Sequence, residues 1–324
     1  MSKQIGRKVE AAIAIETSRG VGKAPVYSLG KTEYSLYDKT VDVRDDSSLG
    51  RIEDSNDKYV VEKYAMGSIS GILGGNSALY LTHLAFGGSP SVGSVSDSRY
   101  PWTLALANTN QHASAALLIK DANQTVMHKL VMLNSLEITI EQEEAVRYTA
   151  EFIAKKAVTS TQSIPTYVED YKFTKRKSKI YVADVVGNLA SATRLSLKSF
   201  KLTINKNLVR DSGIGTVEPE DILNQQLSVE GELKLNYSDQ TYRNYMLNGT
   251  YRAMRLFMEA EKLLGSTSYP DMTLDFAKMD FFGWEPETPN DEIVQNSLNF
   301  KSNYDLTTAT SLYAGTVRNA LSSE

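Results

Sequence analysis

The sequence predicts a mainly β fold, and three observations support this prediction. Apolar and polar residues alternate along many segments, which is typical of strands that bury one face. Only two short segments carry the signals of a helix, a capping residue before it and a glycine after it. The hydrophobic fraction of the 324-residue chain is 41%, enough for a substantial core.

The clearest strand is the segment 227–235, where apolar residues and glycine occupy one face and serine, glutamate and lysine the other. The segment 146–152 repeats this alternation. Further strands are predicted at residues 59–73, 102–107, 113–120, 126–140, 180–185, 195–208, 251–261, 272–282 and 294–304.

The two helices are predicted at residues 78–86 and 240–248. The first follows an asparagine–serine pair and ends before Gly87, and the second follows serine–aspartate and ends before Gly249. Helices of about ten residues are not stable alone in water. We therefore expect both to pack on the sheet.

The helices also indicate an internal repeat. A shift of 162 residues, half of the chain, places the first helix and the strand before it on the second helix and its strand, with Tyr80 on Tyr242. The same shift places residues 135–138 on residues 297–300. We therefore expect two copies of one unit, the first at residues 1–165 and the second at residues 166–324. Residues 159–179 between the copies are predicted to form a linker or an exposed hairpin.

Two strands share a change of phase. The segments 133–140 and 197–204 resemble each other, and in both the apolar positions switch faces after a serine, Ser135 or Ser199. A β-bulge explains the switch, because one inserted residue turns the following side chains to the other face of the sheet.

Each proposed copy has a long polar loop before its pre-helix strand, at residues 44–57 and 209–221. Loops longer than about 12 residues are usually functional or disordered, and two at similar positions indicate a function. We expect their charged residues to make interface contacts. These candidates are Asp45, Asp46, Arg51, Glu53, Asp54, Arg210, Asp211, Glu218 and Glu220.

The composition argues against an enzyme. The chain has no cysteine, which excludes disulfides, thiol catalysis and cysteine-based metal sites. His83, His112 and His128 lack the spacing of a helical metal pair, and no two carboxylates stand out as an acid/base couple. Trp102 and Trp284 are expected in the core or an interface. We expect no catalytic activity, no cofactor and no bound metal.

Three segments resemble ligand sites but fit structural roles better. Glycines at residues 67–75 match neither a dinucleotide fingerprint nor a P-loop, so we expect a tight turn. The acidic loop from Asp45 places Leu49 and Asn56 where an EF-hand needs calcium ligands, so we expect a solvated or salt-bridging loop. The basic run 175–179 lacks interleaved aromatics for stacking bases, so we expect it to be solvated.

The net charge is −4 and the pI about 5.6, so the whole chain lacks the basic surface that grips nucleic acid. A mild acidic excess fits a surface that repels DNA. The first residues contain no apolar signal segment, and no apolar stretch approaches the roughly 20 residues of a membrane helix. We expect folding in a cytoplasm and no membrane contact.

Several motifs carry a resemblance to a known family. They are Gly6-Arg7-Lys8-Val9 before an apolar strand, Glu16-Thr17-Ser18-Arg19-Gly20 with Pro25, and the strands around Ser135-Leu136 and Ser199-Phe200. The order of strand, long loop, strand, short helix and strand adds to them. In these features the chain resembles the tail tube, or major tail, proteins of long-tailed bacteriophages, over most of its length.

The resemblance implies a β-sandwich with one short helix in each copy, whose inner sheets form a β-barrel ring on oligomerisation. Stacked rings form the tail tube, the conduit for genome ejection. Most such proteins carry one unit and form rings of six, whereas duplicated chains form rings of three with pseudo-sixfold symmetry. The internal repeat favours three chains, with six as the alternative. The implied partners are further copies, tape-measure and tail-terminator or tip proteins, with DNA passing through the lumen of a virion tail assembled in the host cytoplasm.

The resemblance also assigns roles to surface residues. The two long loops are expected to contact neighbouring rings, and wet-face carboxylates are expected to line the lumen, with an outer solvated face as the alternative. The lumen candidates are Glu137, Glu230 and Glu232. The rival interpretations are the tube of a contractile tail or secretion device, another virion β-protein such as a tail-tip or decoration component, and a β-sandwich binding module or hydrolase.

Overall fold

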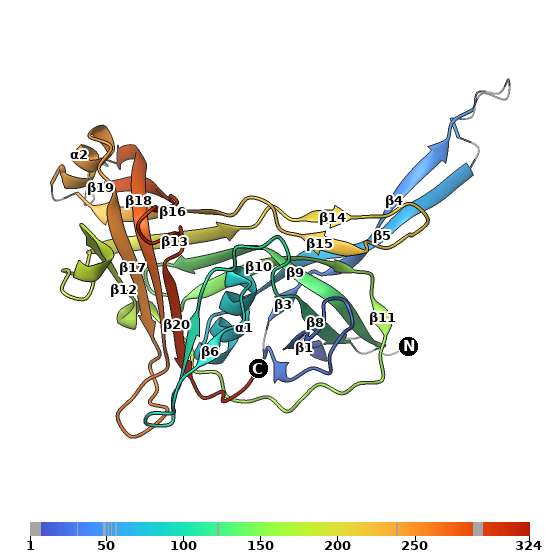
Figure 1. Ribbon diagram of the computed structural model, residues 1–324, viewed down its shortest axis with the longest axis horizontal. Helices are drawn as coiled ribbons and strands as arrows, with labels where there is room; N and C mark the ends of the chain where they lie inside the picture. Colours follow the sequence, from blue (N-terminus) through green and yellow to red (C-terminus); the bar gives the residue numbers. More distant parts are fainter. Residues whose placement is uncertain are drawn as a thin grey trace.

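The computed structural model describes residues 8–30, 32–47, 50, 52, 54–55, 57–121, 123–237, 239–287 and 294–324. Antiparallel strands dominate it, and nearly all belong to one large sheet that runs through both halves of the chain (Figure 1). The mainly β prediction is confirmed. The elements are β1 (Glu10–Ile15), β2 (Tyr27–Ser28), β3 (Glu33–Tyr34), β4 (Tyr37–Asp45), β5 (Asp57–Ile72), α1 (Gly75–Phe86), β6 (Ser91–Val92), β7 (Tyr100–Leu104), β8 (Ala115–Lys120), β9 (Thr125–Ile140), β10 (Arg147–Lys155), β11 (Val158–Thr159), the 3-10 helix η2 (Lys175–Lys177), β12 (Lys179–Ala183), η3 (Val186–Asn188), β13 (Leu197–Asn205), β14 (Val209–Asp211), β15 (Asp221–Leu223), β16 (Ser228–Asn236), α2 (Thr241–Leu247), β17 (Arg252–Glu259), β18 (Asp271–Glu287), β19 (Gln295–Ser302) and β20 (Ala314–Asn319).

The centre of the sheet is a run of antiparallel strands from both halves. In the first half the order is β4–β5–β10–β9, and in the second it is β13–β16–β19–β18. The halves are joined where β9 pairs with β13, from Ile140 opposite Phe200 to Ser135 opposite Asn205. No described pair links β4 with β18, so the sheet stays open within one chain.

The two halves share the order of their strand pairs. In each half a hairpin leads into a helix, β4–β5 into α1 and β13–β16 into α2, and a second hairpin then returns to the first. This second hairpin lays β10 beside β5 and β19 beside β16. Strand β8 flanks β9 as β17 flanks β18, and β1 and β12 lie outside them.

This order corrects one part of the repeat. The 162-residue shift matched residues 135–138 with residues 297–300, but the first set lies in β9 and the second in β19. By pairing, β19 corresponds to β10 and β9 to β18. That match is wrong because neighbouring strands of a hairpin carry the same alternation and cannot be distinguished by phase. The division into two domains stays a prediction.

Both helices and both bulges are confirmed. Helix α1 starts at Gly75, earlier than predicted, so Ser77 lies in its first turn, and it ends at Gly87, where φ is 75°. Helix α2 spans Thr241–Leu247 and is followed by Gly249, where φ is 59°. The register shifts insert one extra residue before Ser135 and one before Ser199, as their change of phase predicts.

The two long polar loops are hairpins instead. Strand β4 continues to Asp45 and β5 begins at Asp57, so the first loop is the end of a β-hairpin. The second contains the two-stranded sheet β14–β15. Sequence reasoning missed β4 because its side chains are exposed on both faces, which removes the alternation that marks a half-buried strand. It also missed β20.

The core is continuous through both halves. One cluster of buried side chains includes Ile69 and Phe152 from the first half and Phe200 and Phe300 from the second. Helix α1 is buried along its whole length and packs against β9, β18 and β20, whereas α2 is partly exposed and packs against β18. The layer formed by β1, β2 and β8 contributes to the same cluster, so one face of the central sheet is covered.

The segment between the halves is more than a linker. It runs along the periphery of the molecule and then enters the core at Asp170 and Phe173 (Figure 1). The Asp170 carboxylate accepts hydrogen bonds from the backbone N–H of Asn76 at 2.7 Å and from the Ser77 hydroxyl at 2.7 Å. A carboxylate at this position accepts hydrogen bonds from N–H groups that have no acceptor within the helix. Its negative charge also interacts favourably with the positive end of the helix dipole.

We expect Asp170→Ala to lower the free energy of unfolding by about 2 kcal/mol or more, because buried donors at the start of α1 lose their acceptor. Urea denaturation of the purified chain measures this. The matched control is Glu169→Ala, since the side chain of Glu169 is exposed and pairs with Lys262 at the surface. The control should change the same free energy by less than about 0.5 kcal/mol. Equal effects of the two substitutions would contradict the capping role.

Candidate assembly surfaces

The uncovered face of the central sheet is polar across both halves. Cross-strand pairing aligns one residue from each of seven strands into a continuous row. From β5 to β18 the row is Ser70, Thr149, Glu137, Thr203, Glu230, Lys301 and Asp280. The next row, which includes Leu136, Ile204 and Val229, points to the core. Because successive side chains of a strand point to opposite faces, the sheet has one solvent-facing polar face and one buried face.

The three predicted lumen residues lie on this polar face, but the sequence did not reveal their partners. Glu137 pairs with Lys201 at 2.8 Å, and Glu230 pairs with Lys301 at 2.8 Å. Glu232 lies opposite Lys201 on the neighbouring strand. Exposed pairs of this kind contribute little to stability. Acids still outnumber bases on the face, with Glu137, Glu151, Glu230, Glu232, Asp280, Glu285 and Glu287 against Arg147, Lys201, Lys234 and Lys301.

The central sheet ends in two open edges. On one side, β3 and β4 pair only with β5 among the described strands. On the other, residues 280–287 of β18 pair with β19 and have no described strand on their outer side. Open edges are ready templates for pairing with another chain.

Each open edge has the same position in its half as one of the two strands, β9 and β13, that pair with each other inside the chain. Strand β18 holds the place in the second half that β9 holds in the first, and the β3–β4 edge holds the place of β13. The two open edges thus occupy the positions of the two strands that pair at the β9–β13 junction.

The end of the β4–β5 hairpin projects from the body, and we call residues 40–62 the arm (Figure 1). Among the described residues, its outermost contact with the rest of the chain lies near Glu62, ten residues after Ile52 in the sequence, or about 30 Å along an extended strand. The side chain of Ile52 is fully exposed. The candidates Asp45, Asp46 and Asp54 are on the arm, whereas Arg51 and Glu53 lie outside the described residues.

The second loop braces the base of the arm. Arg210 donates to Glu62 at 2.9 and 3.2 Å and lies over the ring of Tyr64, and Glu218 pairs with Lys156 at 3.1 Å. Burial raises the pKa of the Glu62 carboxyl, but the hydrogen bonds from Arg210 and Ser212 outweigh burial and hold that pKa below its usual value. Arg210 and Glu218 thus have partners within the chain.

The candidates Asp211 and Glu220 are exposed at the end of the same hairpin. The backbone N–H of Glu220 donates to the carbonyl of Asp211 at 2.8 Å and closes the hairpin.

A buried polar cluster locks the two halves together. Arg19 donates to the carboxylate of Asp221 at 2.5 Å and to the carbonyl of Ile222 at 2.6 Å. The ammonium of Lys206 donates to the carbonyl of Leu84 in the last turn of α1 at 2.8 Å. Burial, with a smaller contribution from Arg19, lowers the pKa of Lys206 to about 7.

The protonation of Lys206 predicts a pH dependence of stability. Its pKa is about 7 in the folded chain and about 10.4 in an unfolded one, so the unfolded chain binds more protons between these values. The free energy of unfolding should therefore rise between pH 7 and pH 10, by up to about 1.4 kcal/mol per pH unit. Urea denaturation across this range measures the slope.

Lys206→Met should flatten this slope, whereas the exposed-lysine control Lys39→Met should retain it. A slope that survives in Lys206→Met would assign the titration to another group.

The histidines and tryptophans have structural roles. All three histidines are buried, and each has a partner: His83 contacts Glu324 at 2.8 Å, His112 the carbonyl of Ala107 at 3.0 Å, and His128 the carbonyl of Lys155 at 3.4 Å. The indole N–H of Trp102 donates to the carbonyl of Leu321 at 2.9 Å, and Trp284 packs beside Tyr237.

Within the described ranges, no three His, Asp or Glu side chains gather to hold a metal ion. The glycine-rich segment is a strand end and a turn, where Gly74 approaches the Asp170 carboxylate too closely for a side chain. Neither helix in the described part of the chain is long and apolar enough to cross a membrane.

Two complementary sheet edges and a projecting arm are the features of a structural subunit that joins its neighbours by extending a sheet. The family model of phage tail tube proteins matches residues 6–301, and the chain belongs to this family. The family is structural and not enzymatic, its members assemble into a tube, and the chain is a component of the virion tail. No curated protein shows a significant match to the sequence.

Proposed function

We propose that this chain polymerises as stacked rings into the tube through which a phage genome leaves the virion. The observation that carries the proposal is the equivalence of the open edges, β18 and β3–β4, with the paired strands β9 and β13. Repeating the internal junction from chain to chain joins the sheets head to tail and closes a cyclic ring.

The ring is proposed to contain three chains. Each chain carries two sets of β strands with the same pairing order, so the two halves represent duplicated units. Three chains then supply six units, with true threefold and approximate sixfold symmetry. In this arrangement half of the junctions lie within a chain, which raises the effective concentration of their partners and favours ring closure.

The polar face of the sheet lines the lumen in this proposal, because the opposite face is covered by α1 and the β1–β2–β8 layer. Its acidic excess repels phosphate, and the pairing of Lys201 and Lys301 with glutamates reduces the attraction of these lysines for DNA. A genome then slides past the wall without being held. Tape-measure and tail-terminator or tip proteins are the other partners that this role requires, with assembly in the host cytoplasm.

Averaged electron micrographs and native mass spectrometry of assembled protein should show rings of three chains with a central hole. Cross-sections should fit threefold symmetry better than sixfold, because the halves differ in sequence and in the burial of their helices. Rings of six whole chains would contradict this stoichiometry, and an absence of rings and tubes would contradict the proposed function.

Reversing charge on the polar face should make the tube retain DNA. For the double substitution Glu230→Lys and Glu232→Lys, we expect tubes that bind fluorescent DNA at low salt and release it as salt rises. Co-sedimentation of DNA with preformed tubes measures the retention. The control is Glu169→Lys together with Glu261→Lys, two acids outside this face of the sheet. No retention by the double substitution would contradict the proposal that DNA passes along the polar face, and equal retention by the control would show that the effect does not depend on this face.

A further inference from the structure

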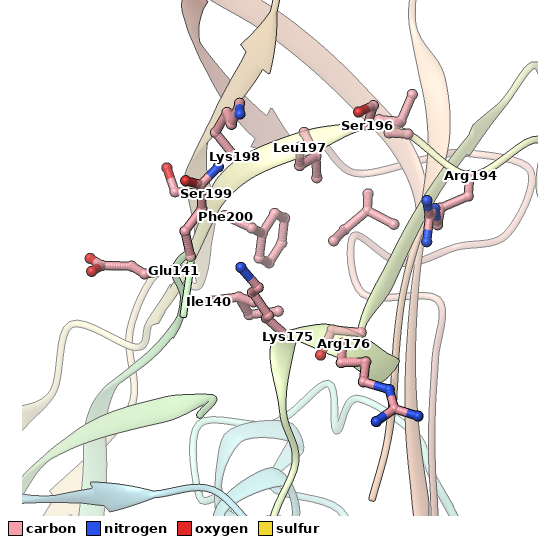
Figure 2. Close-up of a pocket in the computed structure, with 14 residues that line it drawn as sticks. Ile140, Glu141, Lys175, Arg176, Arg194, Ser196, Leu197, Lys198, Ser199 and Phe200 are labelled. Carbon is pink, nitrogen blue, oxygen red and sulfur yellow. The ribbon is translucent and has the colours of Figure 1, made fainter. Parts of the chain in front are cut away.

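A pocket of about 240 Å³ opens at the junction of the two halves, between the end of β9, the 3-10 helix η2 and the start of β13 (Figure 2). Ile140, Ile180 and Phe200 contribute apolar side chains. The charged lining is dominated by cations, which are Lys175, Arg176, Arg194 and Lys198, against the single acid Glu141.

The cations that line this pocket differ from their neighbour Lys177 in their ion pairing among the described residues. Lys177, in the same basic run, pairs with Glu259 at 3.4 Å and lies over the ring of Tyr269. By contrast, none of the four pocket cations forms a salt bridge with a described residue. Figure 2 shows Lys175 pointing into the pocket toward Phe200, and Glu141 pointing away from it.

From the sequence we expected residues 175–179 to be solvated, because no aromatic residues interleave with them. Arg194 and Lys198 are distant from this run along the chain. The fold brings them together, and Lys198 is the extra residue of the β13 bulge. A site with an apolar floor and an excess of cations fits a segment that presents carboxylates around an exposed apolar side chain.

The end of the arm has this composition. Its acids include the half-buried Asp45 and the exposed Asp46, Asp54 and Asp57, and the fully exposed Ile52 lies among them in the sequence. Its acidic excess is complementary to the basic excess of the pocket.

The arm end and the pocket lie at opposite ends of the same strands. Strand β5 runs from the arm at Asp57 to Ile72, which is opposite Arg147, and Arg147 is opposite Thr139 beside the pocket residue Ile140. These 16 residues span about 50 Å. A chain therefore cannot fill its own pocket, but copies stacked in one direction present the arms of one layer to the pockets of the next. Such a head-to-tail contact repeats along an open assembly.

We propose that the pocket at the β9–β13 junction is the docking site for the arm end of a second copy of this chain in the adjacent ring. Ile52 packs against the apolar lining that Ile140 and Phe200 contribute to, and the acids of the arm pair with Lys175 and Arg194. The inference rests on the proposed function, because it requires stacked rings, and it names the surface that holds them together.

Charge reversal tests the pairing. The double substitution Lys175→Glu and Arg194→Glu should leave rings intact and reduce the mass of sedimentable tubes at least tenfold. Asp45→Lys, Asp46→Lys and Asp54→Lys together should do the same. A chain that carries both sets should recover tubes, because the reversed charges attract again. The matched control Arg243→Glu, on the exposed helix α2, should assemble normally.

A crosslink tests the contact without relying on lost assembly. The chain has no cysteine, so Ile52→Cys with Ser196→Cys introduces the only two thiols. Oxidised tubes should give ladders of covalently joined chains, whereas Ile214→Cys with Ser196→Cys should not, although Ile214 is equally exposed on the other hairpin. Ladders from the Ile214 pair alone would overturn the choice of occupant.

The remaining outcomes separate this inference from the proposed function. Wild-type protein that forms neither rings nor tubes would overturn the proposed function before any variant is compared. Normal tubes from both charge reversals, with no Ile52 crosslink, would overturn the docking site alone. Loss of DNA binding by Lys175→Glu and Arg194→Glu, with normal tubes, would show that the pocket binds nucleic acid instead of an arm.

Discussion

The structure depends on the pairing of β9 with β13. This junction turns the two halves into one sheet with a continuous buried face and a continuous polar face. Its register is fixed by alternation, since a slip of one residue would exchange Glu137 with its buried neighbours on the same strand. The same register aligns the polar row across seven strands, and no described strand pairs with the outer side of β3–β4 or of residues 280–287 of β18. The assembly surfaces are thus consequences of one internal contact.

The halves share a pairing order but differ in how they use it. Helix α1 receives Asp170 at its first turn and Lys206 at its last, both from segments distant in the sequence, and is buried throughout. Helix α2 receives a local hydrogen bond acceptor, Asp239, and stays partly exposed. One hairpin likewise forms the free arm, while its counterpart lies against the body and braces it. The two halves thus share a framework of strand pairs but differ in the contacts that each makes with the rest of the chain.

The sequence predicted the elements whose signals are local. The alternation of the main strands, the glycines after both helices and the phase changes at Ser135 and Ser199 each depend on a few neighbouring residues. Strand β4 was not predicted, because it has no buried face and its sequence therefore lacks the alternation of apolar and polar residues. The sequence also did not predict the lysine partners of Glu137 and Glu230 or the cationic pocket. These features depend on the pairing of strands that are distant in the sequence.

The direction of the strand hydrogen bonds has a mechanical consequence. In the proposed ring these bonds connect each strand to the next around the circumference, whereas successive rings meet through side chains at the ends of hairpins. A wall built in this way resists widening, because radial expansion must break many backbone bonds at once. It bends more readily, because curvature along the axis needs only small shifts at the ends of the arms. The tube is then expected to resist changes of its diameter and to bend easily along its axis.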